Sequence, residues 1–125
     1  MQGLAEAGLI GVGGFAGALA RHWVSSLNTS EWPAGTMTAN LLGAFVLGLL
    51  SVRLAHSPTL GPLVLVGFLG SFTTFSTLCH ESIDRNHKGH GGQGRSVMTN
   101  TLYLLVSVLC GVLLSYIGEK IGSRM

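Results

Sequence analysis

Four apolar stretches, separated by short polar connections, make up most of the chain. Each is long enough to cross a bilayer as a helix, because the hydrocarbon core needs about 20 helical residues. We place these helices at residues 7–27, 35–55, 61–83 and 97–119. In the first connection, Trp32 suits a membrane interface and Pro33 suits a helix start. The pattern predicts an all-α membrane protein with one four-helix transmembrane domain, residues 1–125.

The third apolar stretch is unusual because polar side chains gather inside it. Five hydroxyl residues alternate with phenylalanines just after two glycines: Gly67, Phe68, Gly70, Ser71, Phe72, Thr73, Thr74, Phe75, Ser76 and Thr77. Hydroxyls can bond back to carbonyls of the preceding turn, but five within seven residues exceed that need. The glycines tolerate an unwound backbone, which survives at membrane depth where it is buried or lines a wet cavity. We therefore expect this helix to line a path for a polar solute.

The first two helices carry small and polar residues at helical spacing. Gly13 and Gly17 have the spacing that lets membrane helices pack closely, and Arg21 continues the same face. Arg21 either reaches toward the membrane surface or is held inside the bundle, where it would pin a helix end. Asn40 lies in the second helix, beside a stripe of Gly35, Ala39 and Gly43. Because a buried amide needs partners, Asn40 indicates either a contact with another helix or a solute.

Four-residue steps also place polar groups on one face of the third and fourth helices. In the third, Thr73, Thr77 and Glu81 form a hydroxyl-bearing face that ends in a carboxylate. In the fourth, the corresponding face holds Tyr103, Ser107, Gly111 and Ser115. We expect this fourth-helix stripe to face the third helix or its copy in a partner, and the remaining residues to face lipid.

Composition supports a membrane protein with little aqueous structure. Hydrophobic residues make up 47% of the chain and charged residues 10%, whereas soluble domains carry about 25% charged residues. The net charge of +2 gives no reason to expect a nucleic-acid partner. Cys79 and Cys110 lie in or beside apolar stretches, which predicts buried thiols without a disulfide. The lipid bilayer is the expected environment.

The positive charges do not favour one orientation in the membrane. One side would hold Arg53, Lys120 and Arg124, and the other Arg85, Lys88 and Arg95, with Arg21 near a helix end. Orientation follows an excess of Lys and Arg on one side, which is nearly absent here. This balance predicts insertion in both orientations and permits an antiparallel homodimer. The alternative is a single orientation set by a weak bias.

The residues predict no enzyme, because no His–carboxylate pair is placed to activate a hydroxyl. His80 and Glu81 diverge by about 100° on a helix. His87 and His90 lie near one another in a glycine-rich connection, where solvated side chains are the expected state rather than a metal site. Transport is the function that remains. A small anion is a suitable solute, because it can be bound by hydroxyls, an amide, an arginine and the positive edge of a phenyl ring. Cation paths use carbonyls or acidic rings, whereas the acids here lie near helix ends.

Three motifs resemble the Fluc (CrcB) fluoride channel family over essentially the whole chain. They are residues 17–21 (GALAR), residues 35–41 (GTMTANL) and residues 67–77 (GFLGSFTTFST). The resemblance implies a passive, fluoride-selective channel of the cell membrane that exports cytoplasmic fluoride. It implies an antiparallel dual-topology homodimer with two pores, and a third helix broken near Gly70–Thr74. It also implies a structural Na⁺ at the dimer interface, held by the Gly70 and Thr73 carbonyls and their symmetry copies.

The resemblance also assigns roles to individual side chains. Arg21 would be a structural arginine at the vestibule. The fluoride pore would be lined by Asn40, Phe75, Ser76, Thr77, Leu78, Glu81, Tyr103 and Ser107. Leu78 departs from the family pattern, because it stands where relatives carry a second phenylalanine and has no ring edge. We expect fluoride transport to persist here at an altered rate.

Two other classes of protein share this size. A small four-helix drug–proton antiporter needs an acid deep in its first helix, whereas this chain has only Glu6 at the entrance. A non-conducting membrane assembly factor would not need the hydroxyl run in the third helix.

Overall fold

The computed structural model describes the backbone of residues 2–28, 33–88 and 93–125, and their side chains except those of residues 84–97. Within these ranges the chain is helical throughout, with short connections and no β-strand. The helical segments are α1 (Gln2–Ser25), α2 (Ala34–Leu54), η1 (Gly61–Leu69), α3 (Gly70–Phe72), α4 (Phe75–Lys88) and α5 (Gln93–Gly122). The third predicted span consists of three consecutive elements: the π-helix η1 and the α-helices α3 and α4.

Four helical stretches are long and apolar enough to cross a membrane, as the sequence predicts: Gln2–Ser25, Ala34–Leu54, Gly61–Ile83 and Met98–Gly122. The first and last helices extend beyond their expected limits, because α1 begins at Gln2 and α5 runs from Gln93 to Gly122. Hydropathy marks only the part of a helix that suits the hydrocarbon core, whereas hydrogen bonding continues the helix into the polar interface. The protein is therefore a multi-pass membrane protein.

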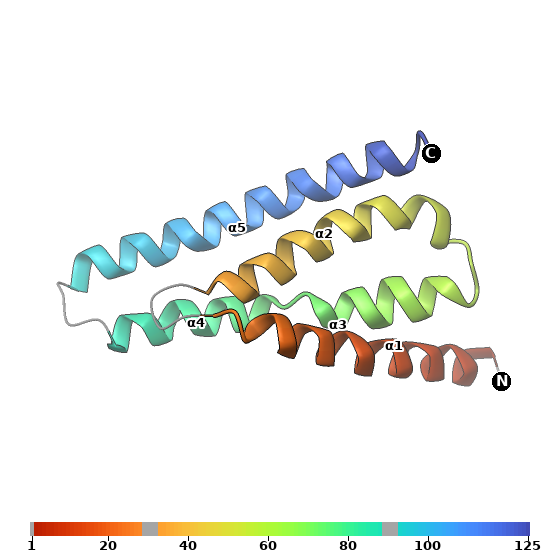
Figure 1. The fold of residues 1–125 in the computed structure, drawn as a ribbon, viewed down its shortest axis with the longest axis horizontal. Helices are drawn as coiled ribbons and strands as arrows, with labels where there is room; N and C mark the ends of the chain where they lie inside the picture. The colour runs from red at the N-terminus through yellow and green to blue at the C-terminus, as the bar shows by residue number, and fades with distance from the viewer. Residues whose placement is uncertain (1, 29–32, 89–92) are drawn as a thin grey trace.

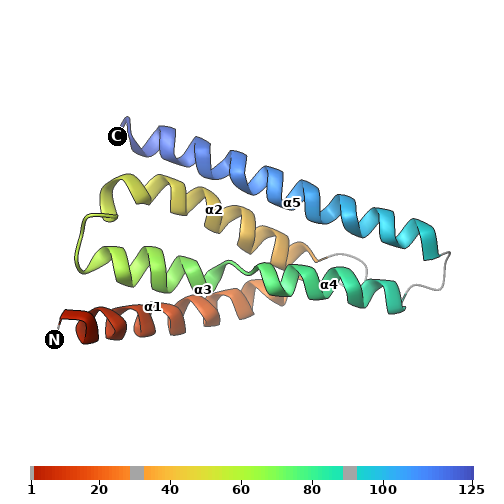
Figure 2. The ribbon, with the colours of Figure 1, turned by 180° about the vertical axis from the view of Figure 1, so that it is seen from behind.

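The spans associate mainly as two pairs, with α2 packed along α5 and α1 packed along η1 and α3 (Figure 1). Both chain termini lie at one end of the bundle, together with the connection between α2 and η1 (Figure 2). The end of α4 and the start of α5 lie at the opposite end, and the end of α1 and the start of α2 point toward it. This alternation is the up-and-down arrangement that short connections between spans require.

Glycines set the close approach within each pair. A methyl group at Gly17 of α1 would overlap the Phe68 carbonyl of η1, and one at Gly13 would overlap the Leu63 carbonyl. On the other side of the bundle, a methyl group at Gly48 of α2 would overlap the Ser115 carbonyl of α5. The small-residue spacing predicted to bring membrane helices together is confirmed.

The third span is interrupted at Thr73 and Thr74. Thr73 has φ −82° and ψ 150°, an extended conformation that ends α3, and α4 begins two residues later at Phe75. Phe72 stays with the first half of the span, where its ring stacks on Phe68 at 5.9 Å between centroids. Because the interruption changes the direction of the side chains after it, Thr73 no longer shares a face with Thr77 and Glu81.

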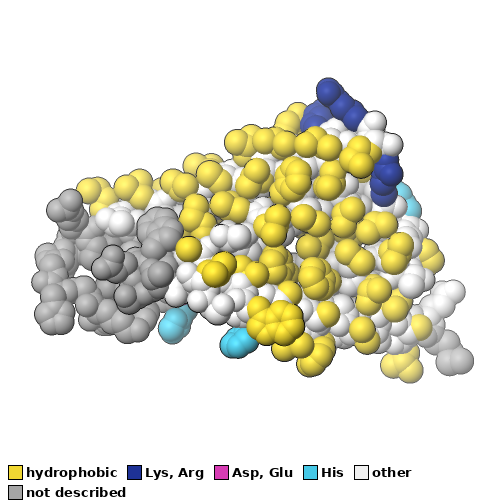
Figure 3. All heavy atoms as spheres, in the orientation of Figure 1, with side chains coloured by type: hydrophobic (Ala, Val, Ile, Leu, Met, Phe, Trp, Pro, Cys, Tyr) yellow, Lys and Arg dark blue, Asp and Glu magenta, His cyan; other side chains and the backbone are white. Residues whose placement is uncertain are grey.

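Apolar side chains are spread over the part of the face in Figure 3 whose side chains the structure describes. Among the side chains that the structure describes, the Lys and Arg visible on this face lie at the end that holds the C-terminus. Large hydrophobic residues such as Phe15 and Leu109 are about two-thirds exposed, at 70% and 68%. Such a surface suits contact with lipid chains or with another membrane protein.

Candidate functional site

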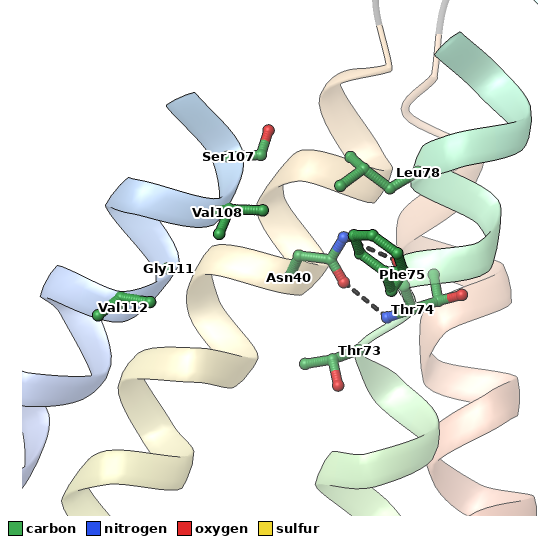
Figure 4. Close-up of a pocket in the computed structure, with 9 residues that line it drawn as sticks. All are labelled: Asn40, Thr73, Thr74, Phe75, Leu78, Ser107, Val108, Gly111 and Val112. Carbon is green, nitrogen blue, oxygen red and sulfur yellow. Dashed lines mark hydrogen bonds between the residues drawn. The ribbon is translucent and has the colours of Figure 1, made fainter. Parts of the chain in front are cut away.

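The interruption of the third span is held by a side chain of α2. Asn40 donates Nδ2–H to the Thr74 carbonyl at 3.0 Å and accepts the Thr74 amide on Oδ1 at 2.6 Å (Figure 4). The amide side chain thus satisfies both backbone groups of a residue outside the helical ladder. An unpaired backbone group at membrane depth would be costly, so Asn40 stabilises the interruption.

Thr74 in turn caps the helix that follows it. Its Oγ1 accepts the amide of Thr77 at 3.3 Å and donates to the Thr77 hydroxyl at 3.1 Å, as an N-cap threonine does. In a continuous helix the Thr74 amide would bond to Gly70 and the Thr77 amide to Thr73. Because both amides bond elsewhere, the carbonyls of Gly70 and Thr73 lose their usual helical donors.

A pocket of about 230 Å³ opens beside the interruption. Its lining comes from α2, α4, α5 and the interruption itself: Asn40, Thr73, Thr74, Phe75, Leu78, Ser107, Val108, Gly111 and Val112 (Figure 4). Ser107 is 7% exposed, and its hydroxyl has no hydrogen-bond partner among the described residues. Leu78 is buried, whereas Phe75 is 68% exposed. The pocket therefore offers a buried hydroxyl and an exposed phenyl ring in an apolar setting.

Arg21 joins the two halves of the third span. Its Nε donates to the Ser71 carbonyl at 3.1 Å, and its Nη1 donates to the Thr77 hydroxyl at 3.5 Å. The guanidinium is partly buried and is held against the third span by these bonds. Its five donors in a fixed plane allow one side chain to bond both sides of the interruption.

Glu81 contacts α2 and the segment that follows α1. Its Oε1 accepts hydrogen bonds from Asn28 Nδ2 at 2.9 Å and from the Thr36 hydroxyl at 2.7 Å. On another side of α4, Asn100 of α5 donates to the Ser82 carbonyl at 2.7 Å. Asn28, Thr36 and Asn100 were not among the predicted site residues. Two of them carried a recognisable signal, because Asn28 is an amide at a helix end and Asn100 is an amide at the start of an apolar helix.

The structure brings only part of the predicted site together. Asn40, Phe75, Leu78 and Ser107 line one pocket, with the Thr73 side chain. The other predicted pore residues do not line it: Ser76 is exposed, Tyr103 is 5% exposed, Thr77 contacts Arg21, and Glu81 contacts Asn28 and Thr36. His87 and His90 lie outside the side chains that the structure describes.

Four spans and an interrupted third helix, held by polar side chains of its neighbours, define a small multi-pass membrane protein with a polar site inside the bilayer. Residues 8–119 match the family described as CrcB-like protein, Camphor Resistance (CrcB). The chain belongs to this family, as the three sequence motifs predict.

Named relatives align with this chain over most of its length. A protein of Staphylococcus aureus named fluoride-specific ion channel FluC 1 is 42% identical over 119 residues, which cover 91% of this chain and 93% of the relative. A Geobacillus kaustophilus protein of the same name is 40% identical over 116 residues, covering 90% of this chain and 94% of the relative. Fluoride-specific ion channel FluC 2 of Staphylococcus saprophyticus is 38% identical over 119 residues.

Proposed function

We propose that this chain forms a fluoride channel of the cell membrane, through which cytoplasmic fluoride leaves passively. The observation that carries the proposal is the pocket beside the interruption. It combines the Phe75 ring with the Ser107 hydroxyl, which has no partner in the described part of the chain, and none of the described residues that line it is a carboxylate. A hydroxyl donor and the positive edge of a phenyl ring suit a small anion that has shed part of its water. The names of the relatives support fluoride as that anion.

The pore would be completed by a second copy in the opposite orientation. Phe75 is 68% exposed and Ser76 is exposed as well, so one chain alone leaves the start of α4 uncovered. Polar groups facing lipid would be unsatisfied, whereas a partner copy could cover them. The balanced basic residues allow both orientations in one membrane. An antiparallel homodimer with two symmetry-related pores follows from this arrangement.

A structural sodium ion fits the interruption of the third span. The Gly70 and Thr73 carbonyls lose their helical donors, because Asn40 takes the Thr74 amide and Thr74 takes the Thr77 amide. Carbonyl oxygens suit a hard cation, and the two carbonyls of one chain would be joined by their copies in the partner. The ion would supply a partner for carbonyl oxygens that the interruption deprives of their helical donors.

The alternative of a drug–proton antiporter is not favoured. Glu6, the acid of α1, is exposed near the start of that helix. An antiporter of this size needs a carboxyl group deep in the membrane to exchange protons.

Fluoride efflux from liposomes tests the proposal directly. Purified protein would be reconstituted in vesicles loaded with potassium fluoride, and release would be started with valinomycin and followed with a fluoride electrode. We expect release of fluoride but not of chloride from matched vesicles, with no pH gradient applied. Retention of fluoride, or equal release of both halides, would contradict the proposal. Protein-free vesicles are the control for leakage.

A further inference from the structure

Three side chains from separate parts of the chain meet just after the end of α1. They are those of Asn28, Thr36 and Glu81, which we call the clamp. Asn28 Nδ2 donates to the Thr36 hydroxyl at 3.1 Å and to Glu81 Oε1 at 2.9 Å. The Thr36 hydroxyl donates to the same Glu81 oxygen at 2.7 Å, and the Thr36 amide donates to Asn28 Oδ1 at 3.1 Å. Among the described residues, every hydrogen bond made by a side chain of the clamp thus joins two of its three members.

Local sequence explains why the clamp forms here. Pro33, the N-cap residue of α2, makes no side-chain capping bond, so Asn28 Oδ1 supplies the acceptor for the first turn of α2. Gly35 permits this approach, because a methyl group there would overlap the Val24 carbonyl and lie 2.9 Å from Asn28 Oδ1. Thr36 is fully buried between these elements. The clamp therefore joins the end of α1 and the start of α2 to α4.

The direction of the hydrogen bonds shows what each group contributes. Asn28 Nδ2 and the Thr36 hydroxyl both donate to Glu81 Oε1, so the clamp uses this one oxygen as an acceptor. Glu81 Oε2 is buried and has no partner among the described residues. The clamp therefore needs an acceptor at Oε1, which the amide of a glutamine would also supply.

The position of α4 depends on such lateral bonds. Its link to α3 is interrupted at Thr73 and Thr74, so the helical ladder does not fix its orientation. Phe75 and Leu78, which line the pocket, belong to α4, whereas Glu81 does not line the pocket. We propose that the clamp positions α4, and that Glu81 affects anion transport through this positioning rather than by lining the path. This inference rests on the proposed function.

Two substitutions at residue 81 separate the alternatives. Glu81→Gln keeps the Oε1 acceptor, so we expect fluoride efflux within about threefold of the parent. Glu81→Ala removes the acceptor, so we expect efflux to fall about tenfold or more. Glu119→Gln, the same substitution at an exposed carboxyl of α5, is the control for charge removal. If Glu81→Gln loses as much efflux as Glu81→Ala, the carboxylate itself is required and the inference fails.

A swapped pair provides a second test. Asn28→Asp places a carboxylate oxygen against Glu81 Oε1, and we expect the repulsion to lower both efflux and the thermal unfolding midpoint. Adding Glu81→Gln reverses the roles, because the glutamine amide can donate to Asp at position 28. We expect the double variant to recover both quantities. Recovery of the unfolding midpoint without recovery of efflux would overturn the inference. So would an unchanged unfolding midpoint in the Asn28→Asp variant.

The same measurements distinguish failure of this inference from failure of the proposed function. If the parent protein and Glu119→Gln both release no fluoride, the proposed function fails. The unfolding midpoints of the four clamp variants would still report whether Asn28 and Glu81 are coupled.

Discussion

Replacing Asn40 with leucine should test whether this side chain stabilises the interruption of the third span. Leucine has a similar size and shape but cannot hydrogen-bond. The Thr74 amide and carbonyl, bonded to Asn40 at 2.6 and 3.0 Å, would both lose their partner. Two routes are open to the variant: the two groups stay unpaired, or the Thr74 amide returns to the Gly70 carbonyl and the helix closes.

The two routes set the size of the effect. An unsatisfied buried polar group costs about 1–3 kcal/mol, so leaving both unpaired would cost about 2–6 kcal/mol. Measured polar contacts between membrane helices average about 0.6 kcal/mol, because the unfolded protein in the membrane also finds partners. Closing the helix would in addition give the Thr74 amide a new acceptor in the variant. We therefore expect a loss of about 1–3 kcal/mol in the free energy of unfolding. Efflux should fall about tenfold or more, because either route changes the pocket.

Thermal unfolding in detergent and fluoride efflux from liposomes would be measured on the same preparations. Thr38→Val is a matched control, because Thr38 is an exposed polar residue on the same helix. Asn40→Asp is a second variant, which keeps the acceptor for the Thr74 amide but turns a carboxylate oxygen toward the Thr74 carbonyl. We expect it to suppress efflux. Parental unfolding and parental efflux in Asn40→Leu would refute the role assigned to this residue.

Three further substitutions, with Gly111→Ala as the control for the first, address packing, the pore and the interruption. Gly48→Ala should cost about 1–3 kcal/mol in unfolding free energy by overlapping α5, whereas Gly111→Ala, with open space around it, should change it by less than about 1 kcal/mol. Equal unfolding midpoints would contradict the packing. Leu78→Phe adds a ring edge to the pocket and should change the fluoride efflux rate; identical rates would show that the ring is unimportant there. Arg21→Lys lacks the planar guanidinium whose separate Nε and Nη1 bond Ser71 and Thr77, so it should lower efflux severalfold; parental efflux would argue against the bridging role.

Two residues of the candidate site, Asn40 and Ser107, could be predicted from the sequence alone. Asn40 was recognisable because an amide in an apolar helix must find partners, and Ser107 because it continues a polar stripe. Their meeting with Phe75 in one pocket follows from the packing of α2, α4 and α5. The partner of Asn40 was not recognisable, because a backbone group carries no signal in the sequence.

The sequence by itself determined the four spans, their small-residue faces and the family, because apolar length and residue spacing are local properties. Tertiary structure decided which polar groups meet. Helical periodicity predicts side-chain directions only within an unbroken helix, and the extended Thr73 separates Thr77 and Glu81 from the face on which the sequence places all three. Glu81 then meets Asn28 and Thr36, residues that lie about 50 positions away, because close approach between α1 and α2 brings them to α4.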